Sequence, residues 1–252
     1  MRIDKSLAEE YGSRNKAAFA IEKGYVLVNG KKVAPSYNLK DGDKIEKIEA
    51  EEFYVSVGGF KLSKALKDFD YSVKDKVFAD IGASTGGFTD CLFQNGAKKV
   101  YCIDVGESQL DKSLKDKNIV IIDNFNARNL SNELFCEVLC GAVIDVSFIS
   151  LTYILGAVAN VLQDGADVIA LIKPQFECES KNVGKNGIVT DKKQHKKVLE
   201  KIYDFSVNCG LQPLKLTNAP IVSGKNIEYL MLLRKGNCNK DNKEILIKSA
   251  IL

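Results

Sequence analysis

The stretch Asp80-Ile81-Gly82-Ala83-Ser84-Thr85-Gly86-Gly87-Phe88-Thr89-Asp90 decides the fold of the larger part of this chain. An apolar run, Val77-Phe78-Ala79, leads into it, and a helix can start after it. Glycines at such a turn let the backbone come close to a ligand, and the free amides that open a helix supply hydrogen-bond donors. The stretch therefore predicts a loop that binds a nucleoside cofactor.

The glycine spacing distinguishes between cofactors. The G-x-G-x-x-G fingerprint of dinucleotide sites is missing, and so is the G-x-x-x-x-G-K-[ST] phosphate loop. Asp104 ends a second apolar run, Val100 to Ile103, twenty-two residues after Gly82, where a carboxylate can bind both ribose hydroxyls. This pattern favours S-adenosylmethionine, whose zwitterionic methionine half needs amides and a carboxylate. The alternative is a crossover turn that needs glycine for purely structural reasons.

Composition bounds the other possibilities. The 252 residues are 45% hydrophobic and 27% charged, which is typical of a globular chain with one ordinary domain and a small one. A formal charge of +3 permits a nucleic-acid partner without demanding one. Seven cysteines form no C-x-x-C and no even set, and Met1 to Lys5 lack the apolar core of a signal peptide, so we expect a reduced, cytoplasmic protein. A single histidine leaves no recognisable zinc site, so no metal is predicted.

One uncharged segment is long enough to be considered as a membrane-spanning helix. Val146 to Gln163 runs for eighteen residues without a charge, which meets the lower length limit of a membrane-spanning helix. It contains several polar side chains and is bracketed by Asp145 and Asp164. We interpret it as a strand end followed by a buried crossover helix and expect no stable membrane association, although a membrane-active function stays open as an alternative.

Beyond an acidic hinge at 46–52, apolar strands alternate with helical stretches. The predicted strands are 77–81, 100–103, 119–122, 142–146, 168–172 and 227–233. This order predicts an α/β fold with a mostly parallel, doubly wound sheet. Asp80, Asp104, Asp145 and Lys173 fall at carboxyl ends of these strands, where such sheets bind ligands.

The first residues form a separate unit. We expect helices around 3–11 and 13–21, a strand at 24–30 that enters an Asn-Gly turn, and short strand pieces over 33–45 joined by an Asp-Gly turn. Its sequence resembles an S4 RNA-binding domain at four motifs: Arg2-x-Asp4, Ser13-Arg14-x-x-Ala17, Gly24-x-Val26-x-Val28-Asn29-Gly30 and Asp41-Gly42-Asp43. The resemblance implies contacts to the backbone of structured RNA, which supply affinity more than base readout.

The group that is methylated follows from the residues at the strand ends. No Asn/Asp-Pro-Pro-aromatic loop follows the fourth strand, and the nearest cysteines, Cys136 and Cys140, precede it, so neither amino-group nor cytosine C5 chemistry fits. A ribose 2′-hydroxyl needs a base to take its proton, and lysine can serve. Four residues stand in an order that resembles the Lys-Asp-Lys-Glu tetrad of FtsJ-type ribose 2′-O-methyltransferases: Lys61, Asp145, Lys173 and Glu228.

Together with the S4 motifs, the chain resembles the TlyA (haemolysin A) family of ribosomal RNA methyltransferases. The strings D-I-G-A-S-T-G-G-F-T-D and K-P-Q-F-E carry this resemblance. It implies a class I, Rossmann-like S-adenosylmethionine methyltransferase that modifies a cytidine 2′-oxygen. Lys173 would be the base, Asp145 and Glu228 would orient it, and Lys61 would complete the tetrad. Family members usually carry Arg where this chain has Val57.

The resemblance also assigns the cofactor contacts and the domains. The cofactor-binding residues would be Asp80, Gly82, Ser84, Gly86, Gly87, Asp104 and Asn126. The domains would be 1–47 (S4-like), 48–56 (linker), 57–236 (FtsJ-like) and 237–252 (C-terminal tail). The length resembles the shorter form of the family, which implies the large ribosomal subunit as partner, with 23S RNA as substrate. An RNA-binding assembly factor with little catalysis stays open as a further alternative.

Basic residues predict where RNA lies. The candidates in the first unit are Arg2, Lys5, Arg14, Lys16, Lys31 and Lys32. A second basic segment, 181–201, has Gly184 and Gly187 in an expected mobile loop before a helix, and its RNA candidates are Lys192, Lys193 and Lys196. His195 lies within this charged run, so we expect it on the solvated surface.

Overall fold

The computed structural model of the protein describes residues 1–47, 54–107, 109–222, 224–236 and 243–251. The chain divides into two compact units, Met1–Val57 and Gly58–Leu252. Of the predicted linker, residues 48–53 lie outside the described residues. Each unit is considered by itself.

The first unit packs two helices against a two-stranded sheet. Its elements are α1 (Ile3–Ser6), α2 (Arg14–Lys23), β1 (Val26–Val28) and β2 (Ile45–Lys47). Ser13 caps α2 by accepting a hydrogen bond from the Lys16 amide at 3.2 Å. The first helix is shorter than predicted, because after Ser6 the chain continues in turns. The Asn29-Gly30 turn is as predicted: both residues have positive φ, 53° and 71°, and Val28 bridges Lys31.

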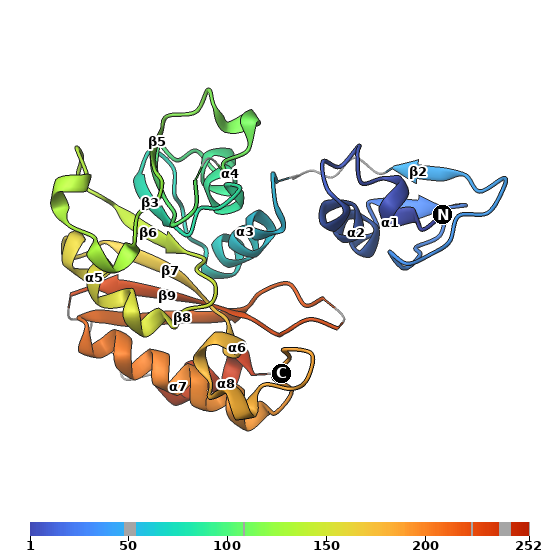
Figure 1. Cartoon of the computed structure of the whole chain (residues 1–252). Coiled ribbons are helices and arrows are strands. Elements are labelled where there is room, and N and C mark those ends of the chain that lie inside the picture. Colours follow the sequence, from blue (N-terminus) through green and yellow to red (C-terminus); the bar gives the residue numbers. More distant parts are fainter. Residues whose placement is uncertain (48–53, 108, 223, 237–242, 252) are drawn as a thin grey trace. The chain divides into compact units, whose positions relative to one another are not determined.

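The second unit is built on one seven-stranded sheet with the order β5-β4-β3-β6-β7-β9-β8. The strands are β3 (Val77–Ile81), β4 (Lys99–Ile103), β5 (Ile119–Ile122), β6 (Gly141–Ile144), β7 (Asp167–Ile172), β8 (Leu211–Asn218) and β9 (Tyr229–Lys235). Six of these seven strands run in the same direction, and β9 is reversed, so it pairs antiparallel with both β7 and β8 (Figure 1). The predicted doubly wound α/β sheet is confirmed, and an antiparallel hairpin forms one edge.

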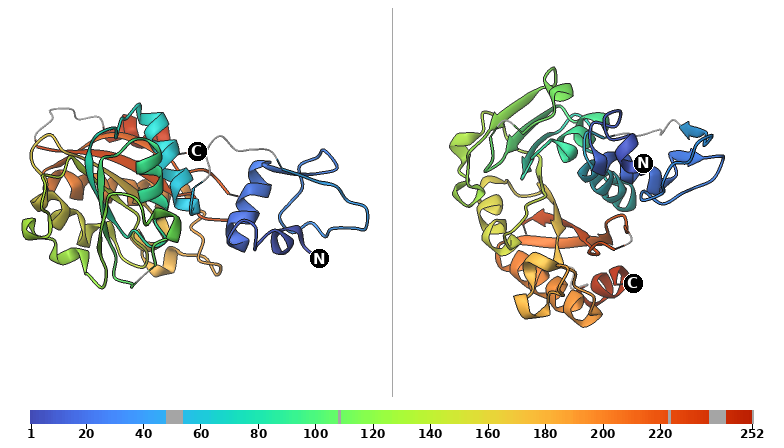
Figure 2. Two further views of the ribbon diagram at one scale, coloured as in Figure 1. Left: turned by 90° about the horizontal axis from the view of Figure 1, so that it is seen from above. Right: turned by 45° about the vertical axis from the view of Figure 1, so that its right-hand side comes forward.

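Helices lie on both sides of this sheet (Figure 2). The α-helices are α3 (Val57–Phe69), α4 (Gly87–Gln94), α5 (Leu155–Val161), α6 (Pro174–Glu177), α7 (Lys192–Asn208) and α8 (Lys243–Ala250). The 3-10 turns are η1 (Lys112–Leu114), η2 (Ala127–Asn129), η3 (Asn132–Leu134), η4 (Leu151–Tyr153) and η5 (Ser180–Asn182). Apolar residues of α5 and α7 form one core with alternate residues of the central strands, such as Ala79 and Ile81.

Two segments differ from their sequence-based description. The uncharged segment 146–163 contains the predicted buried crossover helix, α5, in which Leu155 and Val158 are buried, but it begins with a loop and η4 where a strand end was expected. Within the described ranges, no helix is long and apolar enough to cross a membrane. Residues 237–252 were expected to form a C-terminal tail. Within the described residues 243–251, the chain forms the helix α8, and its Ile247 and Ala250 are buried in the core of the second unit.

Candidate active site

The carboxyl ends of the parallel strands meet at one edge of the sheet. Ile81 of β3 is in register with Ile103 of β4 on one side and with Ile144 of β6 on the other. Asp104 directly follows β4, Asp145 follows β6 and Lys173 follows β7. The predicted alignment along one rim is therefore confirmed for Asp104, Asp145 and Lys173, whereas Asp80 lies within β3 and is completely buried.

A cavity of 590 Å³ opens at this rim. Its polar wall includes Ser84, Asp104, Asn126 and Asp145, and its apolar residues are Ile81, Ile103, Val105, Phe125, Ala127, Val146, Phe148, Ile149 and Ile154. Pockets of about 300–1,000 Å³ with mostly apolar walls and a few polar groups are typical of small-molecule sites.

Gly82 shapes the floor of the cavity. Its φ is +83°, and a Cβ atom built on it would lie 2.6 Å from the backbone oxygen of Asp145. Only glycine combines this left-handed conformation with so close an approach of two backbone segments. The predicted need for glycine at this position has a direct geometric cause.

The Asp104 carboxylate is fixed by two backbone amides. It accepts hydrogen bonds from Ser84 N at 2.7 Å and from Gly106 N at 2.8 Å. A carboxylate offers about four acceptor positions, so capacity remains for two hydroxyl groups. Asn126 lines the same cavity and caps η2, since its Oδ1 accepts from Arg128 N at 3.1 Å.

Three other predicted cofactor residues do not line the cavity. Asp80 is completely buried, and its Oδ2 accepts a hydrogen bond from Thr89 Oγ1 at 2.7 Å. Burial raises the pKa of Asp80 to about 7, and the nearby negative charges of Asp145 and Asp104 add to this effect. Gly86 caps α4 with φ +89° and faces leucine side chains, and Gly87 opens that helix. Their direct contact with a cofactor stays a prediction.

Two ion pairs contain the four predicted catalytic residues. Lys173 Nζ lies 2.6 Å from Asp145 Oδ1 and donates to Ser147 Oγ at 2.7 Å. Lys61 Nζ, from α3, donates to Glu228 Oε2 at 2.6 Å. All four side chains are at most 21% exposed. Such pairs can hold an amine and a carboxylate in fixed positions beside a reacting group.

The sheet register brings the two pairs together. Ile172 of β7 pairs with Tyr229 of β9 in an antiparallel ladder, so Lys173 and Glu228 are the next residues outward on neighbouring strands, at the same end of the sheet. Gln175 Nε2 also donates to Glu228 Oε1 at 3.5 Å. The structure thus joins residues that lie far apart in the sequence.

Sequence reasoning missed several residues at this rim. Ser147 contacts the Lys173 amine and Gln175 contacts Glu228, but neither residue type carries a distinctive signal by itself. Phe148 is 90% exposed at the cavity, has φ +63°, and its ring centroid lies 5.0 Å from that of Phe176. An exposed aromatic in a left-handed conformation is unusual and marks a candidate contact for substrate.

The comparisons with known proteins agree with this geometry. Residues 54–235 match the FtsJ-like methyltransferase family, and residues 1–45 match the S4 domain. The chain belongs to the FtsJ-like methyltransferase family.

Relatives of the chain carry two kinds of name. It is 43% identical to "Hemolysin A" of Brachyspira hyodysenteriae, over 91% of this chain and 98% of that protein. It is 34% identical to "16S/23S rRNA (cytidine-2'-O)-methyltransferase TlyA" of Mycobacterium tuberculosis, over 92% of this chain and 89% of that protein. A solved structure of a protein named as a hemolysin from Streptococcus thermophilus has 40% identity and a TM-score of 0.75, and covers 99% of this chain and 94% of that one.

The cofactor of this FtsJ-like methyltransferase is S-adenosylmethionine, and the cavity fits it. Asp104 has acceptor capacity for the ribose hydroxyls, and apolar residues such as Phe125 and Ile149 offer surfaces for the adenine. Gly82 leaves room where the two backbone segments approach.

The expectation for His195 is wrong. This side chain, in α7, is only 3% exposed. Its Nε2 lies 2.8 Å from Val189 O, and its Nδ1 lies 2.9 Å from Tyr229 Oη. The helix turns its lysines outward and its apolar stripe inward, and His195 lies on the inward stripe. The charge run around it in the sequence hid this periodicity.

One buried carboxylate, Asp4, holds two cations of the S4 unit, Arg2 and Arg14. Asp4 is 2% exposed and accepts hydrogen bonds from Arg2 Nη2 and Arg14 Nε, each at 2.9 Å. Burial alone would raise the pKa of Asp4, but these guanidinium contacts outweigh it and hold the pKa below its usual range. Both arginines stay about half exposed, so they can still face a phosphate.

The remaining RNA candidates differ in exposure. Lys5, Lys31, Lys32, Lys192, Lys193 and Lys196 are exposed, and Lys16 is half-buried. The three in α7 follow an N-cap at Asp191, which accepts from Lys193 N at 2.8 Å. The predicted basic helix is therefore present, and its contact with RNA stays a prediction.

Proposed function

We propose that this protein transfers a methyl group from S-adenosylmethionine to the ribose 2′-oxygen of a cytidine in ribosomal RNA. The observation that carries the proposal is the lysine amine of Lys173, held between Asp145 and Ser147 at the rim of a nucleoside-sized cavity. An S4 unit on the same chain and a relative named for cytidine 2′-O-methylation support RNA as the substrate.

The cofactor supplies a methyl group on a positively charged sulfur. A ribose 2′-hydroxyl is a weak acid, so its oxygen becomes a good nucleophile only as it loses the proton. Lys173, in its neutral form, takes that proton on Nζ. Asp145 then lies 2.6 Å from the new ammonium and stabilises its charge. The proton leaves to solvent before the next turnover.

The other groups act by orientation. Ser147 accepts a hydrogen bond from Lys173 Nζ, which aims the amine along the rim of the cavity. Lys61 forms an ion pair with Glu228, which lies at the same end of the sheet as Lys173. Holding reacting groups in one geometry can contribute several kcal/mol to a rate. We therefore assign Lys61 and Glu228 a role in binding and orienting the ribose.

The finer points of the proposal concern the partner and its location. We propose the large subunit, with its 23S RNA, as the preferred substrate, and the cytoplasm as the compartment, because ribosomal RNA is modified there. Exposed lysines of α7 would neutralise phosphates near the site, with the cofactor held at Gly82, Ser84, Asp104 and Asn126.

The test is methyl transfer from labelled S-adenosylmethionine to separated ribosomal subunits that lack the modification. Lys173→Met keeps most of the side-chain volume but removes the base, and we expect a 10²–10⁴-fold lower kcat, the range that general bases contribute. The matched control is Lys99→Met. Lys99 is also a partly buried lysine in an ion pair, but it lies at the amino end of β4, at the edge of the sheet opposite the cavity.

Label on a cytidine 2′-oxygen of large-subunit RNA, lost in Lys173→Met and kept in Lys99→Met, is the expected result. Transfer by Lys173→Met at the wild-type rate would remove this lysine as the base. Binding of RNA without transfer to either subunit would favour an assembly factor, and dye release from liposomes by pure protein would favour a membrane-active function.

A further inference from the structure

A buried carboxylate near the proposed active site has no part in the proton transfer. Glu177 is the last residue of α6, and its side chain is only 2% exposed. Burying a charged group is costly unless hydrogen bonds or an opposite charge compensate it. The contacts of Glu177 therefore indicate what the charge does in the folded protein.

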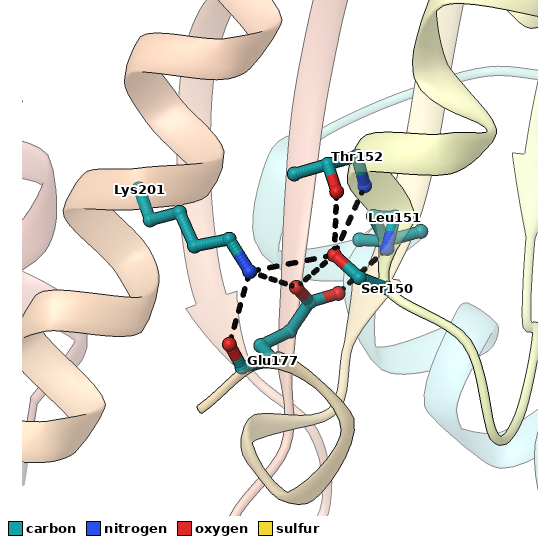
Figure 3. Close-up of polar contacts among 5 residues, drawn as sticks. All are labelled: Ser150, Leu151, Thr152, Glu177 and Lys201. Atoms are coloured by element: carbon teal, nitrogen blue, oxygen red, sulfur yellow. Dashed lines mark hydrogen bonds and ion pairs between the residues drawn. The ribbon is translucent and has the colours of Figure 1, made fainter. Parts of the chain in front are cut away.

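Glu177 accepts hydrogen bonds from three directions (Figure 3). Oε1 accepts from Leu151 N at 2.7 Å, and Oε2 accepts from Ser150 Oγ at 2.5 Å and from Lys201 Nζ at 3.1 Å. Because the single hydroxyl proton of Ser150 goes to Glu177, Thr152 Oγ1 is the donor in its 2.8 Å contact with Ser150 Oγ. The network joins the chain after β6, the chain after β7 and helix α7.

The Glu177 contacts belong to a series of contacts that join the segments 145–151 and 173–177. Nearest the strands, Lys173 contacts Asp145 and Ser147. Farther along, Phe176 packs on Phe148. At the end, Glu177 holds Ser150 and Leu151. The segments 145–151 and 173–177 are thus paired along their length, with the catalytic pair at one end and Glu177 at the other.

The segment between these two ends forms a wall of the cofactor cavity. Val146, Ser147, Phe148 and Ile149 all line it. All four are half-buried or exposed, unlike the buried strand that precedes them. The position of the segment 146–149 therefore depends on the residues at its two ends. The sheet holds the Asp145 end, and Glu177 holds the Ser150 end.

We propose that Glu177 is a positioning residue: it fixes the segment 145–151 so that Asp145 and Ser147 keep the Lys173 amine in place and the cavity keeps its wall. The inference deepens the proposed function and rests on it for the role of Lys173. Lys201 supports the carboxylate from α7, where its Nζ also donates to the Glu177 backbone oxygen at 2.9 Å.

Glu177→Gln tests the inference, because it keeps the side-chain size and removes the negative charge. The amide nitrogen of glutamine would face the Lys201 amine or the Leu151 amide, and two donors cannot pair. Ser150→Ala is a milder second variant that removes one contact. The matched control is Asp167→Asn: Asp167 is a buried carboxylate at the opposite end of β7, paired with Arg234 at 2.8 Å.

Two measurements separate positioning from a general loss of stability. The first is the dissociation constant for S-adenosylhomocysteine by calorimetry, which needs no turnover. We expect Glu177→Gln to weaken binding about tenfold and Asp167→Asn to leave it unchanged. The second is the pH profile of kcat with ribosomal subunits, whose acidic limb reports the loss of the Lys173 proton.

A looser Asp145 favours the ammonium of Lys173 less, so the acidic limb should move to lower pH in Glu177→Gln while kcat falls 10–100-fold. Ser150→Ala should change both quantities in the same direction by less. Wild-type binding and an unmoved limb in Glu177→Gln, or equal changes in Asp167→Asn, would overturn the inference. If the wild-type protein transferred no methyl group, the proposed function would fail, and the binding measurement would still decide the role of Glu177.

Discussion

Replacing Gly82 by alanine should disable the site through a backbone collision. The new Cβ would lie 2.6 Å from Asp145 O and 3.0 Å from Asp145 C, which is about 0.8 Å and 0.4 Å closer than ordinary contact at 3.4 Å. Both neighbours are backbone atoms, so no side chain can rotate away. The segment that carries Asp145 must then move by a large fraction of an ångström.

The cost has two parts. An alanine held at φ +83° is strained by about 1–2 kcal/mol, which lowers the free energy of unfolding. Displacing Asp145 alters its 2.6 Å pair with Lys173, and a misplacement of about 1 Å can cost about 10²-fold in rate. We therefore expect kcat/KM for methyl transfer to fall about 100-fold.

Gly165→Ala is the matched control, since Gly165 has φ +87° and nothing within 4 Å of its missing Cβ. Urea unfolding and methyl transfer to ribosomal subunits should be measured for both variants. Both should lose similar stability from strain, but only Gly82→Ala should lose activity and affinity for S-adenosylhomocysteine. Equal activity in the two variants would refute the argument that the close approach to Asp145 is what requires glycine.

Three further predictions concern single side chains. The folded pKa of Asp80, about 7, exceeds its ordinary 3.8, so the native state binds this proton more tightly than the unfolded chain does. The free energy of unfolding therefore falls by up to ~4 kcal/mol as pH rises from 4 to 7. Asp80→Asn should remove that slope from urea unfolding between pH 4 and 7, and an unchanged slope would contradict the assignment. Phe148→Ala should leave the melting temperature unchanged, as Ile245→Ala should, because both side chains are exposed, but it alone should raise KM for the RNA substrate. Asp4→Asn should release Arg2 and Arg14 and weaken RNA binding in a gel-shift assay, whereas unchanged affinity would mean that their orientation does not matter.

Much of the fold was predictable because the parallel strands are buried on both faces. Strands such as Gly141–Ile144, which Asp145 follows, form continuous apolar runs that sequence patterns identify well. The edge strand β8 was not predicted, because it contains Pro213, alternates polar and apolar residues, and is interrupted by a bulge. Helix α3 was also missed, since Gly58-Gly59 near its start obscures its helical pattern.

The sequence allowed the charged residues of the candidate site to be predicted, but not the residues that hold them in place. Lys61, Asp145, Lys173 and Glu228 fall within recognisable strings, and the structure forms two ion pairs from them. The burial of His195 and the contacts of Glu177 could not be read in the same way, because each depends on segments that are distant in the sequence. Charge and spacing identify a reactive group, but tertiary packing decides which neighbours hold it.

The pairing of Lys61 with Glu228 has a consequence for synthesis on the ribosome. The two residues are 167 positions apart, and they belong to the first helix of the second unit and to the approach to its last strand. A nascent chain that has emerged only as far as β7 already contains the cavity residues, but it lacks Glu228 and the strand that pairs with β7. Closing such a distant contact is a late and slow event in folding. The four residues proposed to be catalytic are therefore present together only after nearly the whole unit has been translated, so we expect an unfinished chain to be inactive.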